Sequence, residues 1–115
     1  MSSPSEPVVI VLDGHLTEGA LRTQLTSAAA QLTRRAAPAP LIVDCSAMTG
    51  YDAEARQLFV EWNARHRARV TAVAIVTHKI LWHVVIAAMA LASGQRMRAA
   101  DTPQAARRWL ASLQA

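Results

Sequence analysis

The feature that most constrains this chain is an alternation that occurs four times: a short run of β-branched and aliphatic residues, then a segment in which apolar residues recur at helical spacing. The strand-like runs cover residues 8–12, 41–44, 70–76 and 96–99, and the helical segments cover 17–33, 52–66, 77–93 and 102–113. Strands that alternate with helices predict an α/β fold with parallel strands and right-handed crossovers. We therefore expect one mostly parallel sheet of four to five strands, with four helices.

Residues that start and stop helices support these boundaries. Thr17 and Thr77 are expected N-caps, because a threonine hydroxyl can accept a hydrogen bond from the first turn. Thr102 followed by proline opens the last helix. Ser93-Gly94 ends the third helix, since glycine readily adopts the left-handed conformation found at helix ends.

The first two strands are expected to end in loops. Asp13-Gly14 is expected to turn the chain after the first strand, and residues 45–51 are expected to form a polar loop after the second. Asp52 is then the expected N-cap of the second helix. The residues predicted to face the core are, on the second helix, Ala55, Leu58, Phe59, Trp62 and His66; on the third, Trp82, Val85, Ile86 and Met89; and on the last, Ala106, Trp109, Leu110 and Leu113.

Length and composition indicate one folded domain. The chain has 115 residues, 52% of them hydrophobic, which excludes a disordered tail protein. A single cysteine, Cys45, excludes a disulfide framework and fits a reducing compartment. Residues 1–7 lack the basic region of a secretory signal, and the apolar run 80–93 is shorter than the roughly 20 residues that span a bilayer. We expect a disordered N-terminus at 1–7, a single domain at 8–115, and a cytoplasmic protein that does not span a membrane.

Charge is distributed unevenly. Residues 1–63 carry four arginines against seven acidic residues, net −3, and residues 64–115 carry seven arginines and one lysine against one aspartate, net +7. A basic half can indicate an acidic partner, nucleic acid or anionic lipid, or only solvated arginines. Nucleic-acid binding is the least favoured, because no strand has the aromatic pattern that stacks on bases.

The common catalytic patterns are absent from the sequence. It contains neither a glycine-rich phosphate loop nor a Gly-x-Ser-x-Gly nucleophile turn. The four histidines show no metal-ligand spacing with cysteine or carboxylates. Asp52 and Glu54 are two residues apart, so on a helix they do not face each other as an acid–base pair. We expect no enzyme activity, no cofactor and no metal.

Polar residues instead gather after the strands. His15 and His78 each follow a strand and are expected at the same end of the sheet, where ligands bind in open α/β folds. Asp52 and Glu54 lie at the start of the second helix, where unpaired N–H groups and the helix dipole favour negative charge.

The whole succession resembles the STAS domain, the family of bacterial anti-sigma-factor antagonists and of sulphate-transporter cytoplasmic tails, over roughly residues 8–113. The resemblance is carried by the order and spacing of Val-Ile-Val-Leu-Asp-Gly-His-Leu at 9–16, Leu-Ile-Val-Asp-Cys-Ser at 41–46, Val-Ala-Ile-Val at 73–76, Ser-Gly at 93–94 and Asp-Thr-Pro-Gln-Ala at 101–105.

The resemblance also implies a regulatory position that this chain has changed. In regulatory members a hydroxyl at the start of the second helix is phosphorylated. Matching Asp44 and Ser46 to the family pattern puts Ala53 at the first hydroxyl position and Glu54 at the phosphorylated one. Glu54 cannot accept phosphate. It is either a fixed partial mimic of a phosphoserine or a carboxylate that stabilises the first helical turn by about 0.3–1 kcal/mol.

Two functions follow from the resemblance. The first is non-enzymatic regulation through a protein partner, namely an anti-sigma kinase, a signalling complex or a second copy, with Tyr51 as the main anchor. The expected docking residues are Gly14, His15, Ser46, Thr49, Gly50, Tyr51, Asp52, Glu54, Thr77, His78 and Lys79. The alternative follows a STAS-like branch related to lipid-binding Sec14 domains: a carrier of a small apolar ligand or lipid, with a cavity lined by Phe59, Trp62, Trp82 and Met89.

Overall fold

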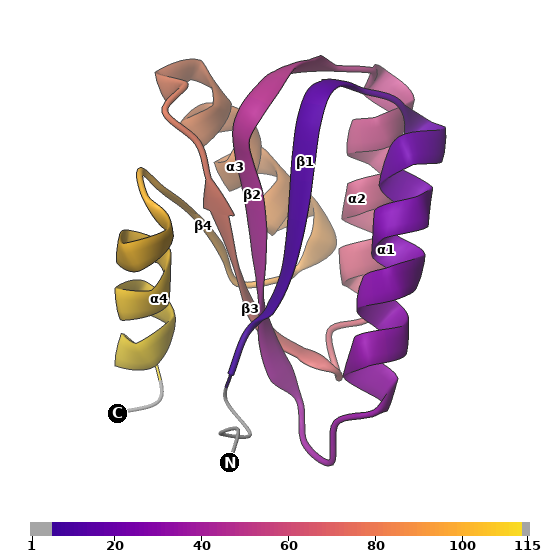
Figure 1. The fold of residues 1–115 in the computed structure, drawn as a ribbon, viewed down its shortest axis with the longest axis vertical. Helices are drawn as coiled ribbons and strands as arrows, with labels where there is room; N and C mark the ends of the chain where they lie inside the picture. The colour runs from indigo at the N-terminus through magenta and orange to yellow at the C-terminus, as the bar shows by residue number, and fades with distance from the viewer. Residues whose placement is uncertain (1–5, 114–115) are drawn as a thin grey trace.

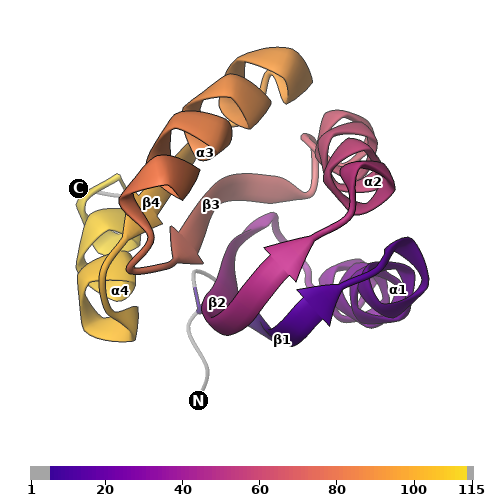
Figure 2. The same ribbon diagram turned by 90° about the horizontal axis from the view of Figure 1, so that it is seen from above.

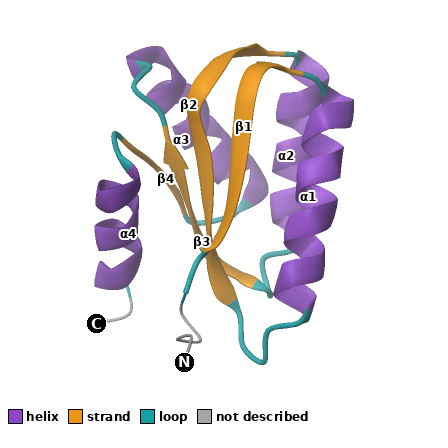
Figure 3. Cartoon of the chain, in the orientation of Figure 1, coloured by secondary structure: helices purple, strands orange, loops and turns teal. Residues whose placement is uncertain are grey.

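The computed structural model describes residues 6–113 and contains four strand–helix units in succession (Figures 1 and 3). Residues 1–5, most of the segment predicted to be disordered, and residues 114–115 lie outside the described part. The elements are β1 (Val8–Leu16), α1 (Glu18–Thr33), β2 (Ala39–Tyr51), α2 (Ala53–Arg65), β3 (Val70–Val76), α3 (Ile80–Ser93), β4 (Met97–Ala100) and α4 (Pro103–Ser112).

The described strands form one sheet in the order β1-β2-β3-β4, and every neighbouring pair is parallel. Helices α1, α2 and α3 cover one face, and α4 covers the other (Figure 2). Each face has its own apolar core, which explains why β3 is apolar along almost its whole length. The predicted α/β fold is confirmed, with four strands among the described residues.

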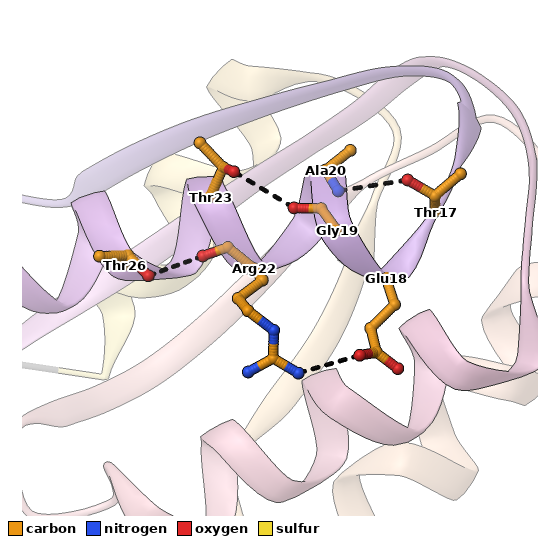
Figure 4. Close-up of polar contacts among 7 residues, drawn as sticks. All are labelled: Thr17, Glu18, Gly19, Ala20, Arg22, Thr23 and Thr26. Carbon is orange, nitrogen blue, oxygen red and sulfur yellow. Dashed lines mark hydrogen bonds and ion pairs between the residues drawn. The ribbon is translucent and has the colours of Figure 1, made fainter.

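Helix α1 shows how local chemistry fixes an element. The Thr17 hydroxyl accepts a hydrogen bond from Ala20 N at 3.2 Å, as predicted for an N-cap (Figure 4). Glu18 pairs with Arg22 one turn later, while the hydroxyls of Thr23 and Thr26 donate to carbonyls in the preceding turn. The face toward the sheet is apolar and consists of Leu21, Leu25, Ala28 and Leu32. The polar outer face stays in water, so α1 is an amphipathic helix that packs on the sheet along its length.

The two loops predicted after the first strands are wrong, because β1 and β2 remain paired as far as Leu16 and Tyr51. Strand β3 leaves β2 much earlier, at the pair Asp44↔Val76. Beyond that point β1 and β2 form a two-stranded ribbon, which bends toward α1 and α2 (Figure 2). Gly14, expected in a turn, lies inside this ribbon with φ +59°. Its left-handed conformation accompanies the bend, since bulges and glycines increase local twist.

Three other boundaries also differ from the predictions. Thr77 does not cap α3: it is buried, its hydroxyl accepts a bond from Lys79 N, and the helix begins at Ile80 after Lys79. His66 is not part of α2 but follows its last residue, and β4 covers 97–100 instead of 96–99. The left-handed Gly94 after α3 and the Thr102 cap of α4 are confirmed.

Helix α3 packs loosely. Of its four residues predicted to face the core, only Ile86 is buried; Trp82, Val85 and Met89 are half-buried. Its outer face consists of large aliphatic side chains in water, with Ile80, Leu81, Val84 and Leu91 exposed by 79%, 81%, 71% and 87%. On α4, Ala106 and Leu110 are buried as predicted, while Trp109 and Leu113 are only partly buried against the second core. No helix among residues 6–113 is long and apolar enough to cross a bilayer.

Candidate functional site

An apolar pocket lies on the three-helix face of the sheet, with α2 and α3 on opposite sides. It has a cavity volume of about 70 Å³, within about 510 Å³ of empty space that includes open solvent at the mouth. The lining residues come from six elements and are Leu12, Leu16, Leu21, Cys45, Met48, Tyr51, Ala55, Arg56, Phe59, Ile75, Trp82, Val85, Ile86 and Met89. The wall is almost wholly carbon, so the pocket favours an apolar occupant over a polar one.

The ribbon supplies one wall of the pocket through its bulges. Cys45, Met48 and Tyr51 are three residues apart, and regular alternation would turn successive members to opposite faces. The register with β1 shifts between Asp44 and Ala47 and again between Met48 and Gly50, so that β2 has one extra residue in each interval. Each extra residue therefore returns the next of these three side chains to the same face of the ribbon. All three side chains therefore line the pocket.

Three of the four residues predicted to line a cavity do line the pocket: Phe59, Trp82 and Met89. The fourth, Trp62, does not. It is buried and stacks on His66, with ring centroids 4.2 Å apart. The indole therefore anchors the C-terminal end of α2, where His66 Nδ1 donates to the Trp62 carbonyl at 2.8 Å.

Tyr51 is not the exposed aromatic tip that the sequence suggested. It is half-buried and meets the edge of Trp82, with centroids 5.5 Å apart and planes at 70°. Trp82 in turn lies under Lys79, whose Nζ is 5.3 Å from the ring centroid. Aromatic edge contacts and cation–π contacts of this kind each contribute about 0.5–1.5 kcal/mol. These three side chains connect the tip of β2 to the start of α3.

A histidine–aspartate pair closes the end of the ribbon. His15 Nε2 donates to Asp52 Oδ1 at 2.7 Å, with both side chains about half exposed. Asp52 occupies the predicted N-cap position of α2, but its side chain makes no capping bond there. A Cβ at Gly50 would lie 3.1 Å from His15 Nδ1, so a larger residue at this position would require the imidazole to shift by a few tenths of an ångström.

The remaining predicted docking residues, together with Ala53 at the predicted first hydroxyl position, lie in two parts of the structure. Ser46 and Thr49 are exposed on the ribbon, and the Ser46 hydroxyl donates to Asp44 at 2.6 Å. Ala53 and Glu54 are exposed in the first turn of α2, next to the ribbon. Thr77 and His78 follow β3, which ends on the side of β4 and α4, away from the ribbon tip (Figure 2). Of the residues after β3, only Lys79 is connected to the ribbon, because its Nζ lies over Trp82, which in turn contacts Tyr51.

The sequence analysis did not assign eleven of the fourteen lining residues to a cavity, among them Cys45, Met48 and Arg56. The first two were placed in a loop, and only the bulges reveal their shared facing. Burial raises the pKa of the Cys45 thiol to about 12, with a smaller contribution from the Asp44 carboxylate. The thiol is thus neutral and behaves as a small apolar group in the wall. Within the described part of the chain, no group of three or more His, Cys, Asp or Glu could hold a metal ion.

Comparisons with known proteins agree with this geometry. A solved structure of an uncharacterized protein from the DUF3478 family, with a SpoIIAA-like fold and from Shewanella loihica PV-4, aligns with a TM-score of 0.73. The two chains are 15% identical, and the alignment covers 90% of this chain and 83% of that one, which supports the shared fold alone. No curated protein matches the chain significantly. The family model described as SpoIIAA-like matches residues 8–111, so the chain belongs to the SpoIIAA-like family, as the resemblance to STAS domains predicted.

Proposed function

We propose that this domain binds a small apolar ligand in the pocket between α2 and α3, without catalysing a reaction. One observation carries the proposal: the carbon-lined pocket has an open mouth, and one of its walls is the loosely packed α3. Burying the three half-buried wall residues of α3, Trp82, Val85 and Met89, against a ligand would recover part of the apolar stabilisation that α3 does not obtain from the sheet. The neutral Cys45 thiol supports a binding role over a nucleophilic one.

The proposal is tested with larger side chains that reduce the volume of the pocket. Met89→Trp places a larger side chain on the pocket wall, and Leu91→Trp places the same side chain on the exposed face of the same helix. We expect the first variant to lose most of its affinity for 1-dodecanol, measured by isothermal titration calorimetry, and the second to bind as the wild type does. Val85→Phe repeats the test at a second wall position. Unchanged affinity in folded Met89→Trp and Val85→Phe proteins would refute the proposal.

Regulation through a protein partner is a second candidate, supported by the family and by the exposed polar residues beside the start of α2. Ser46, Thr49 and Glu54 are exposed on the ribbon and on the first turn of α2, the two segments that the His15–Asp52 hydrogen bond joins. In this function the carboxylate of Glu54 takes the place of the family phosphate, and the partner is an anti-sigma kinase, a signalling complex or a second copy. Membership of the SpoIIAA-like family favours a non-enzymatic regulator of this kind.

Charge reversal separates this surface from the rest of α2. Glu54→Lys changes the first turn, and Glu61→Lys makes the same change at an exposed position two turns later. We expect a partner captured from the native host to be retained by Glu61→Lys and lost by Glu54→Lys. Equal capture by both variants would exclude the first turn of α2 from the docking surface.

A further inference from the structure

The pocket wall contains one charged residue, Arg56, in the first turn of α2. Arg56 is exposed, yet the wall to which it contributes is almost wholly carbon. Its aliphatic stem therefore lies along the wall, while its guanidinium stands in water at the mouth. Long basic side chains commonly take this arrangement where an apolar surface meets solvent.

The Arg56 guanidinium has no ion pair within residues 6–113. The carboxylate best placed to neutralise it is Asp52, four residues earlier on the helix. Asp52 is instead bonded to His15. Glu54 is two positions away and so lies on a different side of α2. Among residues 6–113 neither carboxylate forms an ion pair with Arg56, so its guanidinium is open to a ligand.

A second cation, Lys79, lies close to one lining residue: its Nζ is 5.3 Å from the ring centroid of Trp82. No acidic residue is among the lining residues. An occupant of the pocket therefore has carbon around it and a single charged lining residue, the cation Arg56. This combination matches a molecule with an apolar chain and a negatively charged end.

We propose that the pocket takes a single-chain amphiphile with an anionic head, whose tail lies in the pocket and whose head accepts hydrogen bonds from Arg56. The proposal rests on the ligand-binding function above and names the class of ligand. A guanidinium is suited to this role because it can donate two parallel hydrogen bonds to a carboxylate or a phosphate.

The experiment compares heads on one tail. Affinities for dodecanoate, dodecyl phosphate, dodecanol and dodecyltrimethylammonium are measured by isothermal titration calorimetry below micelle-forming concentrations. We expect at least one anion to bind about tenfold tighter than the neutral alcohol, the size expected for one charge-assisted hydrogen bond. The cationic amphiphile should bind more weakly than the alcohol. Comparing the two anions tells a carboxylate head from a phosphate head.

Variants assign the preference to one side chain. Arg56→Ala should abolish the preference for anions, taken as the ratio of the dodecanoate or dodecyl phosphate affinity to the dodecanol affinity of the same variant, while Arg56→Lys should retain part of that ratio. Arg65→Ala, an exposed arginine in the last turn of the same helix, should behave as the wild type. If dodecanol binds but Arg56→Ala keeps the full preference, this inference is wrong and the ligand-binding function stands. If none of the four amphiphiles binds, both are wrong.

Discussion

Helices α1 and α3 cover the same face of one sheet, but they are held there differently. On α1, four apolar residues are buried, the outer face is polar, and Thr17 caps the first turn. On α3, only Ile86 and Ser93 are buried, the outer face is aliphatic, and no side chain caps the first turn. The comparison teaches that α1 completes the core of the domain, whereas α3 mainly forms the wall of a pocket.

The largest expected effect is on the alkylation rate of Cys45. This rate tests whether the loosely packed α3 often moves away from the sheet and exposes the thiol. With a pKa of about 12 instead of 9.0, its thiolate fraction near pH 8 is about a thousandfold lower than that of an ordinary cysteine. We expect iodoacetamide to alkylate the folded protein far more slowly than the protein in denaturing urea. A similar rate in both would show that α3 leaves the sheet often, and that its wall is not a stable one.

The same thiol predicts a pH dependence of stability. Because the folded-state pKa is raised, its contribution is fully present below about pH 9 and is lost as pH rises from 9 toward 12. In that window the free energy of unfolding should fall more steeply for the wild type than for Cys45→Ala. Parallel pH profiles of the two proteins in urea denaturation would contradict the burial of this group.

Paired leucine truncations measure the difference between the helices directly. Leu25→Ala on α1 removes a side chain that is 2% exposed, and should lower the free energy of unfolding by about 2–5 kcal/mol. Leu91→Ala on α3 should change it by less than about 0.5 kcal/mol, because that side chain is already in water. Urea denaturation checks both values. A comparable loss at Leu91 would mean that the outer face of α3 is covered in solution, and that α1 and α3 do not differ in packing.

The smallest effect concerns the helix starts. Thr17→Ala removes the bond to Ala20 N and should lower the free energy of unfolding by about 1 kcal/mol. Lys79→Ala, at the corresponding position of α3, removes no capping bond. It should cost only the contact with Trp82, which is about 0.5–1 kcal/mol at an exposed site. A larger loss for Lys79→Ala than for Thr17→Ala would show that the start of α3 is the more important anchor.

The architecture was predictable because strand-like and helical spacing alternate four times, and because Thr17, Gly94 and Thr102 mark boundaries through local chemistry. The ribbon was not predictable for an equally physical reason. Its bulges break the two-residue alternation by which a strand is recognised, and its polar residues, Ser46 and Thr49, are common in loops.

The candidate site was only partly predictable. Phe59, Trp82 and Met89 follow from helical spacing, but α3 is apolar on every side, so its sequence does not tell a core face from an exposed one. The role of Arg56 in the pocket wall could not be predicted either, because an arginine early in a helix is usually a solvent-exposed residue. Its importance appears only when the ribbon brings Tyr51 and Met48 against α2.

The two bulges in β2 make the number of residues between Asp44 and Tyr51 as decisive as their chemistry. Deleting Ala47 would remove the first bulge and leave Cys45 and Met48 two positions apart, so both would still face the pocket, but the ribbon would lose the local twist that the bulge adds. A homologue with the same side chains and a ribbon one residue shorter would therefore line the pocket with the same groups and curve less toward α1 and α2. Length variation at this spot is thus a route by which such domains can change the shape of the pocket without any substitution in its wall.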